Sequence, residues 1–509
     1  MIIHDITERF RESFSANADK QALRFLRGGR IETALTYADL NSDINQMAAC
    51  FWHKGIRKGE RVVLFLPKSV IFLVAHLALL RIGAVSVPVN PGFMQAEMAY
   101  LTEDTRPALM VAGPAQSEIL AAVNPKLNLL VFDTEKPYAR MDFFRSFGDK
   151  FLSVDIQPED PATIIYTSGT TGQPKGAVLN QGNLFNDARN IIDIWQINAS
   201  DRICHALPLF HVHGLFFAIH TALMAGSEIV MLDRFSPETV LETLAGKDAD
   251  NCCTVFMAVP SMYVRILECI GDERLDFSHV RLWASGSAPL LSKDFERIKK
   301  VFGKAPVERE GMSETGMNFS NPLDGHRKPG SIGLPLPNLS VKIVSPQTGE
   351  TLNPGEIGEI RLKGPGITPG YWKKPRETAE AFENGWFKTG DLGYVDRDGY
   401  YYLTDRIKNI IISGGENISP KEIETVINQM EAVLESSVVG IRDAKWGEKV
   451  VAAIKCRPDA KVDAAEILNH CRRHIHAWKV PKDIKFVEEI PKNRMGKVLT
   501  NEVRRFFTA

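Results

Sequence analysis

The sequence of 509 residues contains no long apolar run and almost no net charge. Its longest apolar run extends from Val70 to Leu80, contains His76 and ends at Arg81, whereas a transmembrane helix needs ~20 apolar residues. The net charge of −1 argues against a general attraction to nucleic acids or anionic membranes. The first residues, "MIIHDITERFRESF", predict an amphipathic helix and lack the apolar core of a signal peptide.

Paired cysteines, internal repeats and low-complexity segments are also lacking. The seven cysteines are an odd number, and no C-x-x-C motif occurs. This pattern argues against a disulfide framework and against a zinc site, and it favours reduced thiols. We therefore expect a cytoplasmic protein without a transmembrane segment and without a nucleic-acid partner. The sequence gives no indication of its oligomeric state.

Short β-rich runs alternate with helical patterns over most of the chain. "RVVLFLP" (61–67) predicts a buried strand, "SVIFLVAHLALLRIG" (69–83) predicts a helix packed on it, and "AVSVPVN" (84–90) predicts the next strand. The same order recurs as far as "VRLWASG" (280–286). We therefore predict an α/β fold with layered parallel sheets.

From about residue 339 the pattern changes to strand–turn–strand, as in "GYVDRDGYYYLTDR" (393–406). Such hairpin signatures predict a small antiparallel β-subdomain over about 339–404. A domain boundary is expected near Asp405 to Lys408. Residues 1–404 then form a large N-terminal domain, and residues 405–509 are enough for a smaller α+β domain.

A loop dense in glycine and hydroxyl groups, "TSGTTGQPKG" (167–176), follows the predicted strand "TIIY". Such a loop turns tightly, points backbone N–H groups inward and adds a lysine, which are the features that hold a polyphosphate. It is not the G-x-x-x-x-G-K-[ST] loop, because its lysine follows Pro174 and precedes a glycine. The alternative is a flexible turn. The residues predicted to bind phosphate are Thr167, Ser168, Gly169, Thr170, Thr171, Gly172 and Lys175.

"YTSGTTGQPKGAV" closely resembles the phosphate loop of the adenylate-forming enzymes, which include acyl-CoA synthetases, luciferases and the adenylation domains of peptide synthetases. Further matches follow in the family's order over nearly the whole chain, at "LPLFHVHG" (207–214), "GMSET" (311–315), "GWFKTGDLG" (385–393), "DRIKNIIISGGENISP" (405–420) and "PKNRMGK" (491–497). The resemblance implies a mobile C-terminal domain hinged at Lys408.

The resemblance implies an ATP-dependent, AMP-forming reaction in two halves. A carboxylate attacks the α-phosphate of ATP, which gives an acyl-adenylate and releases pyrophosphate. The thiol of coenzyme A then attacks the acyl carbon, and AMP leaves. Both halves gather negative charge, so Mg²⁺ and fixed hydrogen-bond donors are expected. A carrier-protein thiol in place of CoA, a luciferase-like activity and a weakly catalytic regulatory protein remain alternatives.

The family motifs assign roles to single residues. By resemblance, Glu314 is the magnesium ligand, and Ser313 contacts the α-phosphate at a position where the family usually has threonine. Lys497 would bring the α-phosphate and the attacking carboxylate together. The remaining nucleotide residues by resemblance are Gly311, Met312, Asp391 (ribose hydroxyls) and Arg406, and the CoA loop comprises Gly414, Gly415 and Glu416.

The acid is harder to assign. "VPSMYVRIL" (259–267) and "SGSAPL" (285–290) resemble malonyl-CoA synthetases, so Arg265, Ser285 and Ser287 are predicted to bind a distal carboxylate. His211 is predicted to line the acid site. A zinc site at His205, His211 and His213 is disfavoured, because no cysteine or carboxylate stands at ligand spacing. The alternative substrate is a medium- or long-chain fatty acid, and Arg265 would then be a surface residue of an amphipathic helix.

One position departs from the family pattern. The charged stretch "VEREGMSETG" (307–316) places Glu310 where the family has an aromatic ring against adenine. A carboxylate cannot stack on a purine and must find a partner if it is buried. We expect weaker ATP binding with intact chemistry. Taken alone, such a charge cluster would be interpreted as a solvated surface turn.

Overall fold

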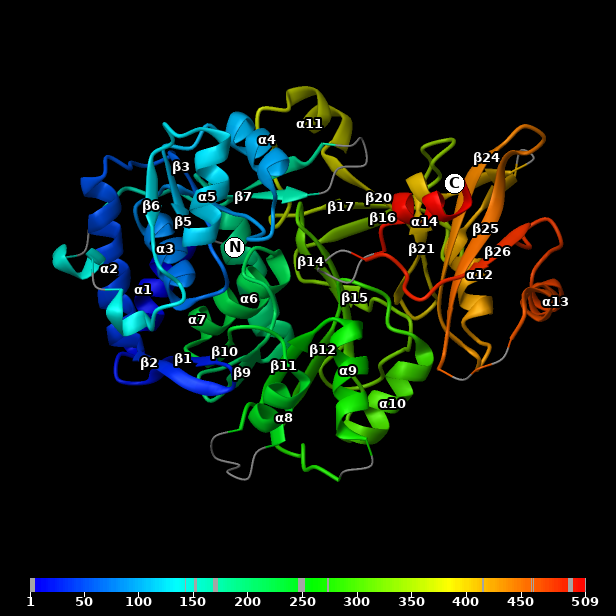
Figure 1. The fold of residues 1–509 in the computed structure, drawn as a ribbon, viewed down its shortest axis with the longest axis horizontal. Coiled ribbons are helices and arrows are strands. Elements are labelled where there is room, and N and C mark those ends of the chain that lie inside the picture. The colour runs from blue at the N-terminus through cyan, green and yellow to red at the C-terminus, as the bar shows by residue number, and fades with distance from the viewer. Residues whose placement is uncertain are drawn as a thin grey trace. The chain divides into compact units, whose positions relative to one another are not determined.

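The structure is a computed structural model in which the chain forms two compact units (Figure 1). The first unit comprises Met1–Ser340 and Lys363–Phe387, and the second comprises Val341–Leu362 and Lys388–Ala509. In the described part of the chain, no helix is long and apolar enough to cross a membrane. The described residues are 5–141, 143–150, 153–167, 173–245, 252–271, 274–413, 416–458, 460, 462–492 and 498–508.

A seven-stranded sheet of the first unit has the order β18–β8–β7–β4–β3–β5–β6. β3 pairs in parallel with β4 and β5, as the sequence predicts, whereas β7 and β8 are antiparallel. The strands are β3 (Arg61–Phe65), β4 (Val85–Pro88), β5 (Leu109–Ala112), β6 (Leu129–Val131), β7 (Pro161–Thr167), β8 (Lys175–Asn180) and β18 (Gly370–Tyr371).

A nine-stranded sheet of the same unit has the order β15–β14–β13–β12–β11–β9–β10–β1–β2. Neighbouring strands pair in parallel from β13 through β12, β11 and β9 to β10. The strands are β1 (Gln21–Arg27), β2 (Arg30–Thr36), β9 (Arg202–His205), β10 (Glu228–Leu232), β11 (Val255–Ala258), β12 (Leu282–Ser285), β13 (Val307–Met312), β14 (Gly316–Ser320) and β15 (Leu334–Pro335).

Helices cover the sheets of the first unit. They are α1 (Ile6–Ala16), α2 (Tyr37–His53), α3 (Val70–Arg81), α4 (Gln95–Thr105), α5 (Pro114–Val123), α6 (Gln181–Trp195), α7 (Thr221–Ala225), α8 (Pro237–Ala245), α9 (Pro260–Ile270), α10 (Ser292–Phe302) and α11 (Pro375–Ala381), with the 3₁₀ turns η1 (Tyr138–Arg140) and η2 (Phe143–Ser146). The segment η3 (His213–His220) is a π-helix, a rare form that is frequent at functional sites.

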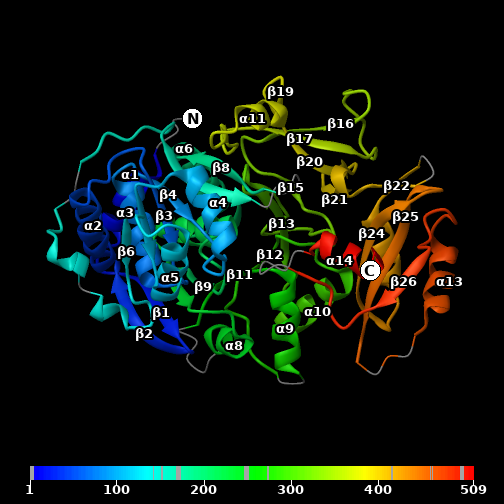
Figure 2. The ribbon, with the colours of Figure 1, turned by 45° about the horizontal axis from the view of Figure 1, so that its top comes forward.

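The strand β3 has both faces buried. Val62 and Leu64 belong to the hydrophobic cluster that contains α3, whereas Val63 and Phe65 belong to a second cluster that contains residues of α4. Figure 2 shows α3 and α4 beside β3 and β4. Because successive side chains of a strand point to opposite faces, a strand covered on both faces is apolar at every position.

Helix α3 is buried along its whole length. Ser69 begins it by accepting a hydrogen bond from the backbone N–H of Phe72, and the helix packs against α2, β3 and β4. A helix that is apolar on all sides belongs in a core. Its polar residue His76 lies within 2.8 Å of Ser86 Oγ and 2.9 Å of His220 Nε2, so its ring nitrogens are paired inside the core.

The second unit contains a five-stranded sheet in the order β23–β22–β25–β24, with β26 beside β25. Its elements are η5 (Ile407–Asn409), β22 (Ile411–Ser413), β23 (Glu416–Ile418), α12 (Pro420–Ile427), β24 (Val433–Asp443), β25 (Gly447–Cys456), α13 (Ala464–His474), β26 (Asp483–Phe486) and α14 (Thr500–Thr508).

The hairpins predicted after residue 339 form a further sheet, β16–β17–β20–β19 with β21 beside β20. β20 and β21 are antiparallel, as "GYVDRDGYYYLTDR" predicts. The division into two compact units falls within this region, after Ser340, Leu362 and Phe387. The domain boundary expected near Asp405 to Lys408 stays a prediction. The strands are β16 (Ser340–Val344), β17 (Gly358–Lys363), β19 (Phe382–Glu383), β20 (Trp386–Val395) and β21 (Tyr401–Arg406).

Candidate active site

The two ends of the predicted phosphate loop lie side by side. Thr167 ends β7 and pairs with Lys175, which begins β8, and the Thr167 hydroxyl donates to the Lys175 carbonyl over 3.3 Å. The Tyr100 hydroxyl donates to the Pro174 carbonyl over 2.8 Å. The antiparallel pair β7–β8 therefore fixes both ends of the loop. The other predicted phosphate contacts lie outside the described residues: Ser168, Gly169, Thr170, Thr171 and Gly172.

The stretch "VEREGMSETG" is a β-hairpin and not a solvated surface turn. β13 and β14 pair from Arg309–Ser320 to Met312–Gly316, and the turn between them holds Ser313 and Glu314. Gly311 is enclosed, because a Cβ there would lie 2.7 Å from the Gly316 carbonyl oxygen. The stretch is therefore part of the nine-stranded sheet of the first unit, while its role as a site stays a prediction.

Glu314 is held by a neighbouring segment. Its carbonyl accepts a hydrogen bond from the N–H of Thr368 over 2.7 Å, and its Oε1 accepts one from the Tyr371 hydroxyl over 3.1 Å. Burial and the Glu314 carboxylate raise the pKa of Tyr371, so the phenol remains a donor. Lys175 Nζ lies 5.4 Å from the centre of the Tyr371 ring. We call Lys175, Glu314 and Tyr371 the Glu314 cluster.

Glu310 has a partner within its own hairpin. Asn318 Nδ2 donates to Glu310 Oε2 over 3.1 Å and to Thr315 Oγ1 over 2.8 Å. Glu310 is half-buried, whereas Asn318 is fully buried. The carboxylate that replaces the expected aromatic ring is therefore held by an amide donor.

Arg309 is a functional candidate that the sequence did not indicate. Its side chain is 4% exposed, and among the described residues neither Nε nor Nη2 has a hydrogen-bond partner. The guanidinium lies 4.9 Å from the Phe217 ring centre. Burial lowers the pKa of Arg309 to about 10, although Glu310 and Asp187 act in the opposite direction, so Arg309 is charged at neutral pH. A buried charge without hydrogen bonds is costly.

Ser287 and His213 lie near this guanidinium. A Cβ on Gly286 would lie 2.5 Å from Arg309 Nε, so the backbone next to Ser287 passes over Arg309. The Ser287 hydroxyl lies 3.3 Å from His213 Nδ1, and His213 Nε2 is buried without a partner in the described structure. Burial and the charge of Arg309 hold the pKa of His213 well below its ordinary value. We call Arg309, Ser287 and His213 the Arg309 cluster.

The other residues predicted for the acid are placed differently. Arg265 is exposed, because helix α9 turns Tyr263 and Ile266 into the core, and its guanidinium lies 4.9 Å from the Phe235 ring centre. Among the described residues no hydrogen bond joins Arg265 to Ser287, which is exposed as well. Ser285 is buried and its Oγ has no partner among the described residues, but it pairs along the sheet with Glu308 and not with Arg309.

The histidines do not form a metal group. His211 is half-buried, and its Nδ1 accepts from the N–H of His213 over 3.3 Å. His205 lies near the same π-helix and its ring is within 3.0 Å of the Gly214 carbonyl. In the described part of the chain, no three His, Cys, Asp or Glu side chains converge to hold a metal ion.

In the second unit, Asp391 and Arg406 form an ion pair. They face each other across β20 and β21, and Arg406 Nε lies 2.7 Å from Asp391 Oδ1. Lys408 follows in η5, where burial and the neighbouring Arg406 lower its pKa. Glu416 begins β23 opposite Ser413. Gly414, Gly415 and Lys497 lie outside the described residues.

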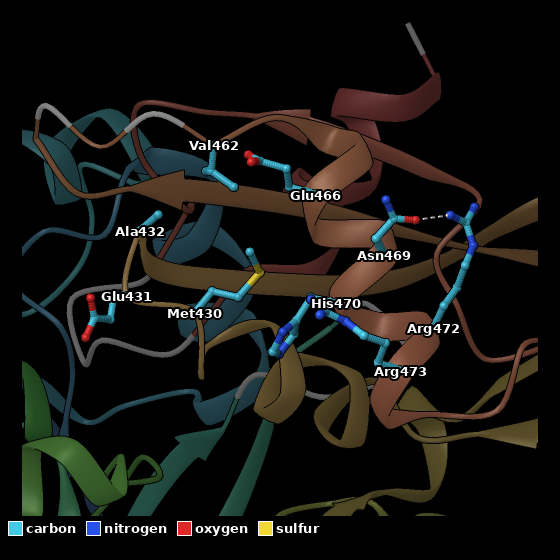
Figure 3. Close-up of a pocket in the computed structure, with 9 residues that line it drawn as sticks. All are labelled: Met430, Glu431, Ala432, Val462, Glu466, Asn469, His470, Arg472 and Arg473. Atoms are coloured by element: carbon cyan, nitrogen blue, oxygen red, sulfur yellow. Dashed lines mark hydrogen bonds between the residues drawn. The ribbon is translucent and has the colours of Figure 1, made fainter.

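A surface recess of the second unit is a separate feature (Figure 3). Residues of α13 and of the segment after α12 line it, and Arg472 donates to Asn469 Oδ1 over 2.7 Å within its rim. It carries carboxylates as well as guanidinium groups, since Glu431 and Glu466 face it too. None of the residues predicted from the sequence lines it, so we do not place the site there.

Comparisons with known proteins agree with the motifs. A profile of the AMP-binding enzyme family matches residues 10–372, and one of the AMP-binding enzyme C-terminal domain matches residues 422–497. The first match alone spans more than half of the chain. Such a match establishes the family.

Curated relatives align over most of the chain. A long-chain-fatty-acid–CoA ligase of Bacillus subtilis (strain 168) is 33% identical over 501 residues, which cover 91% of this chain and 89% of the relative. The mitochondrial malonate–CoA ligase ACSF3 of Bos taurus is 34% identical over 508 residues, which cover 92% of this chain and 84% of the relative.

The fold has a counterpart among solved structures. ATP-bound MatB from Rhodopseudomonas palustris superposes with a TM-score of 0.92 at 35% identity, covering 99% of both chains. This likeness confirms the predicted α/β fold with a large N-terminal and a smaller C-terminal domain. The chain is therefore a member of the AMP-binding enzyme family and an AMP-forming acid–thiol ligase of the acyl-CoA synthetase kind.

Proposed function

We propose that this ligase activates a short dicarboxylate, with malonate as the best candidate, and transfers it to coenzyme A. The observation that carries this proposal is the buried guanidinium of Arg309, whose Nε and Nη2 have no partner in the described structure. A distal carboxylate of the substrate would accept from these two nitrogens, and charge-assisted bonds of this kind are the strong ones.

The neighbouring groups are also suited to an anion. If the Ser287 hydroxyl donates to His213 Nδ1, the neutral imidazole carries its hydrogen on Nε2, which has no partner among the described residues. Arg309 and His213 would then both offer N–H donors. A fatty acyl chain would leave these donors unpaired, at about 1–3 kcal/mol for each buried group. The Arg309 cluster therefore favours an anionic acid over an alkyl chain.

Sequence identity does not decide between these substrates. The fatty-acid ligase at 33% and the malonate ligase at 34% are equally similar to this chain. The finer assignment rests on the Arg309 cluster. Arg265, which the sequence predicts for the distal carboxylate, is exposed beside Phe235. We therefore use its substitution as the control for substitution of Arg309.

For the first half-reaction we propose that Lys175 and the phosphate loop bind the β- and γ-phosphates, and that Ser313 contacts the α-phosphate. Glu314 suits Mg²⁺, since the ion is usually held by one or two carboxylates together with substrate phosphates. When bound, Mg²⁺ would neutralise phosphate charge. Glu314 is half-buried with a fixed carboxylate, so the donor set fits.

The family resemblance supplies the remaining assignments, which we retain as proposals. Asp391 would bind the ribose hydroxyls and Arg406 would lie near them, in keeping with their ion pair. Lys408 would act as the hinge. In the second half-reaction, backbone of the loop that contains Glu416 would border the CoA thiol, which attacks the acyl carbon as AMP leaves. A medium- or long-chain acid, or a carrier-protein thiol, are the alternatives to be tested.

An acid panel tests the proposal. Pyrophosphate release and CoA-thioester formation are followed with malonate, acetate and octanoate, each with CoA or with a carrier protein instead. We expect malonate to give the highest kcat/KM and thioester formation to require CoA. Turnover of octanoate without turnover of malonate would refute the dicarboxylate assignment. Loading of the carrier protein without formation of a CoA thioester would refute CoA as the thiol acceptor.

Lys497 can be tested through the separation of the two half-reactions. We expect Lys497→Ala to abolish adenylation, because the cation that joins carboxylate and α-phosphate is lost, while thiolysis of supplied acyl-adenylate continues. Pyrophosphate release measures the first step, and CoA-thioester formation from synthetic malonyl-adenylate measures the second. Undiminished pyrophosphate release would exclude this role for Lys497.

A further inference from the structure

The segment that contains Tyr371 is fixed against the strand that leaves the phosphate loop. β18 pairs with β8, so that Gly370 faces Val178 and Tyr371 faces Ala177. The N–H of Trp372 donates to the Gly176 carbonyl over 2.7 Å, one residue beyond Lys175. Tyr371 is thus placed by main-chain hydrogen bonds at the exit of the loop.

The same segment is attached to the turn that carries Glu314. The N–H of Thr368 donates to the Glu314 carbonyl over 2.7 Å, and the Thr368 hydroxyl donates to the Val178 carbonyl over 2.5 Å. Residues 368–372 therefore join the β13–β14 turn to β8. These hydrogen bonds fix the backbone on both sides of the carboxylate.

Tyr371 reaches both charged groups from this position. Its hydroxyl donates to Glu314 Oε1 over 3.1 Å, and Lys175 Nζ lies 5.4 Å from its ring centre. The hydrogen bond restricts rotation of the carboxylate. A carboxylate has about four lone-pair positions on its two oxygens, and this hydrogen bond uses one of them.

We propose that Tyr371 is a positioning residue that orients the Glu314 carboxylate for a divalent cation bound to the ATP phosphates. This inference rests on the proposed function, in which Glu314 binds Mg²⁺. Groups that hydrogen-bond to a metal ligand fix its orientation, and their loss usually lowers metal affinity about 10- to 100-fold. In the described hydrogen bonds Tyr371 contacts none of the Arg309 cluster residues, so we expect its removal to leave binding of the acid unchanged.

The experiment measures metal binding without turnover. The Kd of a non-hydrolysable ATP analogue is determined by calorimetry with and without Mn²⁺, and the ratio of the two values gives the coupling between metal and nucleotide. We expect Tyr371→Phe, which retains the ring, to lower this ratio about 10-fold. The apparent KM for Mg²⁺ in pyrophosphate release should rise in parallel, while the KM for the acid stays within about twofold.

Tyr100→Phe is the matched control, because it also removes a tyrosine hydroxyl bound beside the phosphate loop, at Pro174, but leaves Glu314 untouched. We expect the coupling ratio of this variant to stay within about twofold of wild type. An equal loss of coupling in both variants would overturn the proposal, since it would reflect a general disturbance of the loop.

Glu314→Gln separates this inference from the proposed function. If Glu314→Gln lowers the coupling ratio and Tyr371→Phe does not, the role of Tyr371 is refuted and that of Glu314 stands. If Glu314→Gln leaves the ratio unchanged, the metal role of Glu314 is itself refuted, and the inference about Tyr371 fails with it. A loss of coupling in both variants, with Tyr100→Phe unchanged, supports the proposal.

Discussion

The Glu314 cluster and the Arg309 cluster are each built around one residue of the β13–β14 hairpin, but they differ in how their polar groups are satisfied. Glu314 accepts hydrogen bonds through its carbonyl and its carboxylate from a neighbouring segment. Arg309, in contrast, is buried with two nitrogens that lack partners in the described structure. Glu314 is also half-buried, whereas Arg309 is 4% exposed.

The protein itself holds the Glu314 carboxylate by hydrogen bonds, whereas in the described structure it provides no partner for two nitrogens of Arg309. The Glu314 cluster is already ordered by protein contacts, as the proposed binding of phosphates and a cation would require. The Arg309 cluster bears the cost of unpaired buried donors until an anion occupies them. A site of this kind rejects analogues that lack the matching group, because the donors then stay unpaired. Under the proposed function, selection of the acid would therefore depend on the Arg309 cluster.

Arg309→Met should have the largest effect. Loss of the buried cation removes the proposed partner of the distal carboxylate. We expect kcat/KM for malonate to fall roughly 30- to 1,000-fold, which corresponds to about 2–4 kcal/mol of lost binding energy. The melting temperature should not fall, because an unpaired buried charge is replaced by an apolar side chain of similar length. Steady-state kinetics and thermal unfolding measure the two effects.

Arg265→Ala is the control for this variant. Arg265 is exposed on α9, so we expect kcat/KM for malonate to change less than about twofold, as at most exposed charges. A loss as large as that of Arg309→Met would return the distal carboxylate to Arg265. An unchanged kcat/KM in Arg309→Met would remove the basis for a dicarboxylate substrate.

Asp187 is expected to make binding of the acid depend on pH. Its Oδ1 accepts from the N–H of Met317 over 2.8 Å, and burial raises its pKa to about 7, while Arg309 and the hydrogen bond act in the opposite direction. As the pH rises through 7, Asp187 becomes an anion near Arg309, which stays charged. At an effective dielectric of about 20, this repulsion of a dicarboxylate is on the order of 1–2 kcal/mol.

The KM for malonate should therefore rise about tenfold between pH 6 and 8 in wild type, and Asp187→Asn should abolish this rise. Stability changes in the same direction: a carboxyl group with a raised pKa contributes its stabilisation below its unfolded pKa near 4 and loses it as the pH rises through 7. The melting temperature of wild type should fall relative to Asp187→Asn over this range. Parallel pH profiles of the two proteins would contradict the coupling.

The elements of the fold were predictable where burial is local and periodic. The run that became α3 and the hairpin β20–β21 follow from apolar pattern and turn residues. The site was predictable only at its motifs. Arg309 was missed because its burial depends on β12 and β14 lying on either side of β13, which no neighbouring residue indicates. The sequence left open whether Arg265 faces the acid or the solvent, because it does not show which face of α9 meets the core.

Tyr371 shows the same limit at the other cluster. Its contact with Glu314 joins residues 57 positions apart in the chain, and the pairing of a two-residue strand with β8 brings them together. No local pattern in the sequence indicates so short a strand. The sequence motifs therefore do not predict long-range contacts between short elements.

Two serines should change stability in opposite directions. Ser285 Oγ is buried without a partner in the described structure, whereas the Ser287 hydroxyl lies 3.3 Å from His213 Nδ1. We expect Ser285→Ala to stabilise the ligand-free protein by about 1–2 kcal/mol, since an unsatisfied hydroxyl is removed. Ser287→Ala should destabilise it by about 1 kcal/mol and raise the KM for malonate. Thermal unfolding of the two variants measures these changes. Equal shifts of the melting temperature in both variants would contradict the opposite effects predicted for the two serines.

Glu310→Tyr should have the smallest effect, and it concerns ATP rather than the acid. Glu310 and Arg309 are consecutive residues of β13, so their side chains point to opposite faces of the strand, and Glu310 contacts Asn318 rather than Ser287. A tyrosine at this position would restore the aromatic ring that the family places against adenine. ATP binding should then gain about 1 kcal/mol, so that the KM for ATP falls roughly fivefold, while the KM for malonate stays the same.

Asn318 keeps its hydrogen bond to Thr315 Oγ1, so we expect the hairpin to tolerate the change. An unchanged or higher KM for ATP would show that the Glu310 carboxylate does not weaken nucleotide binding.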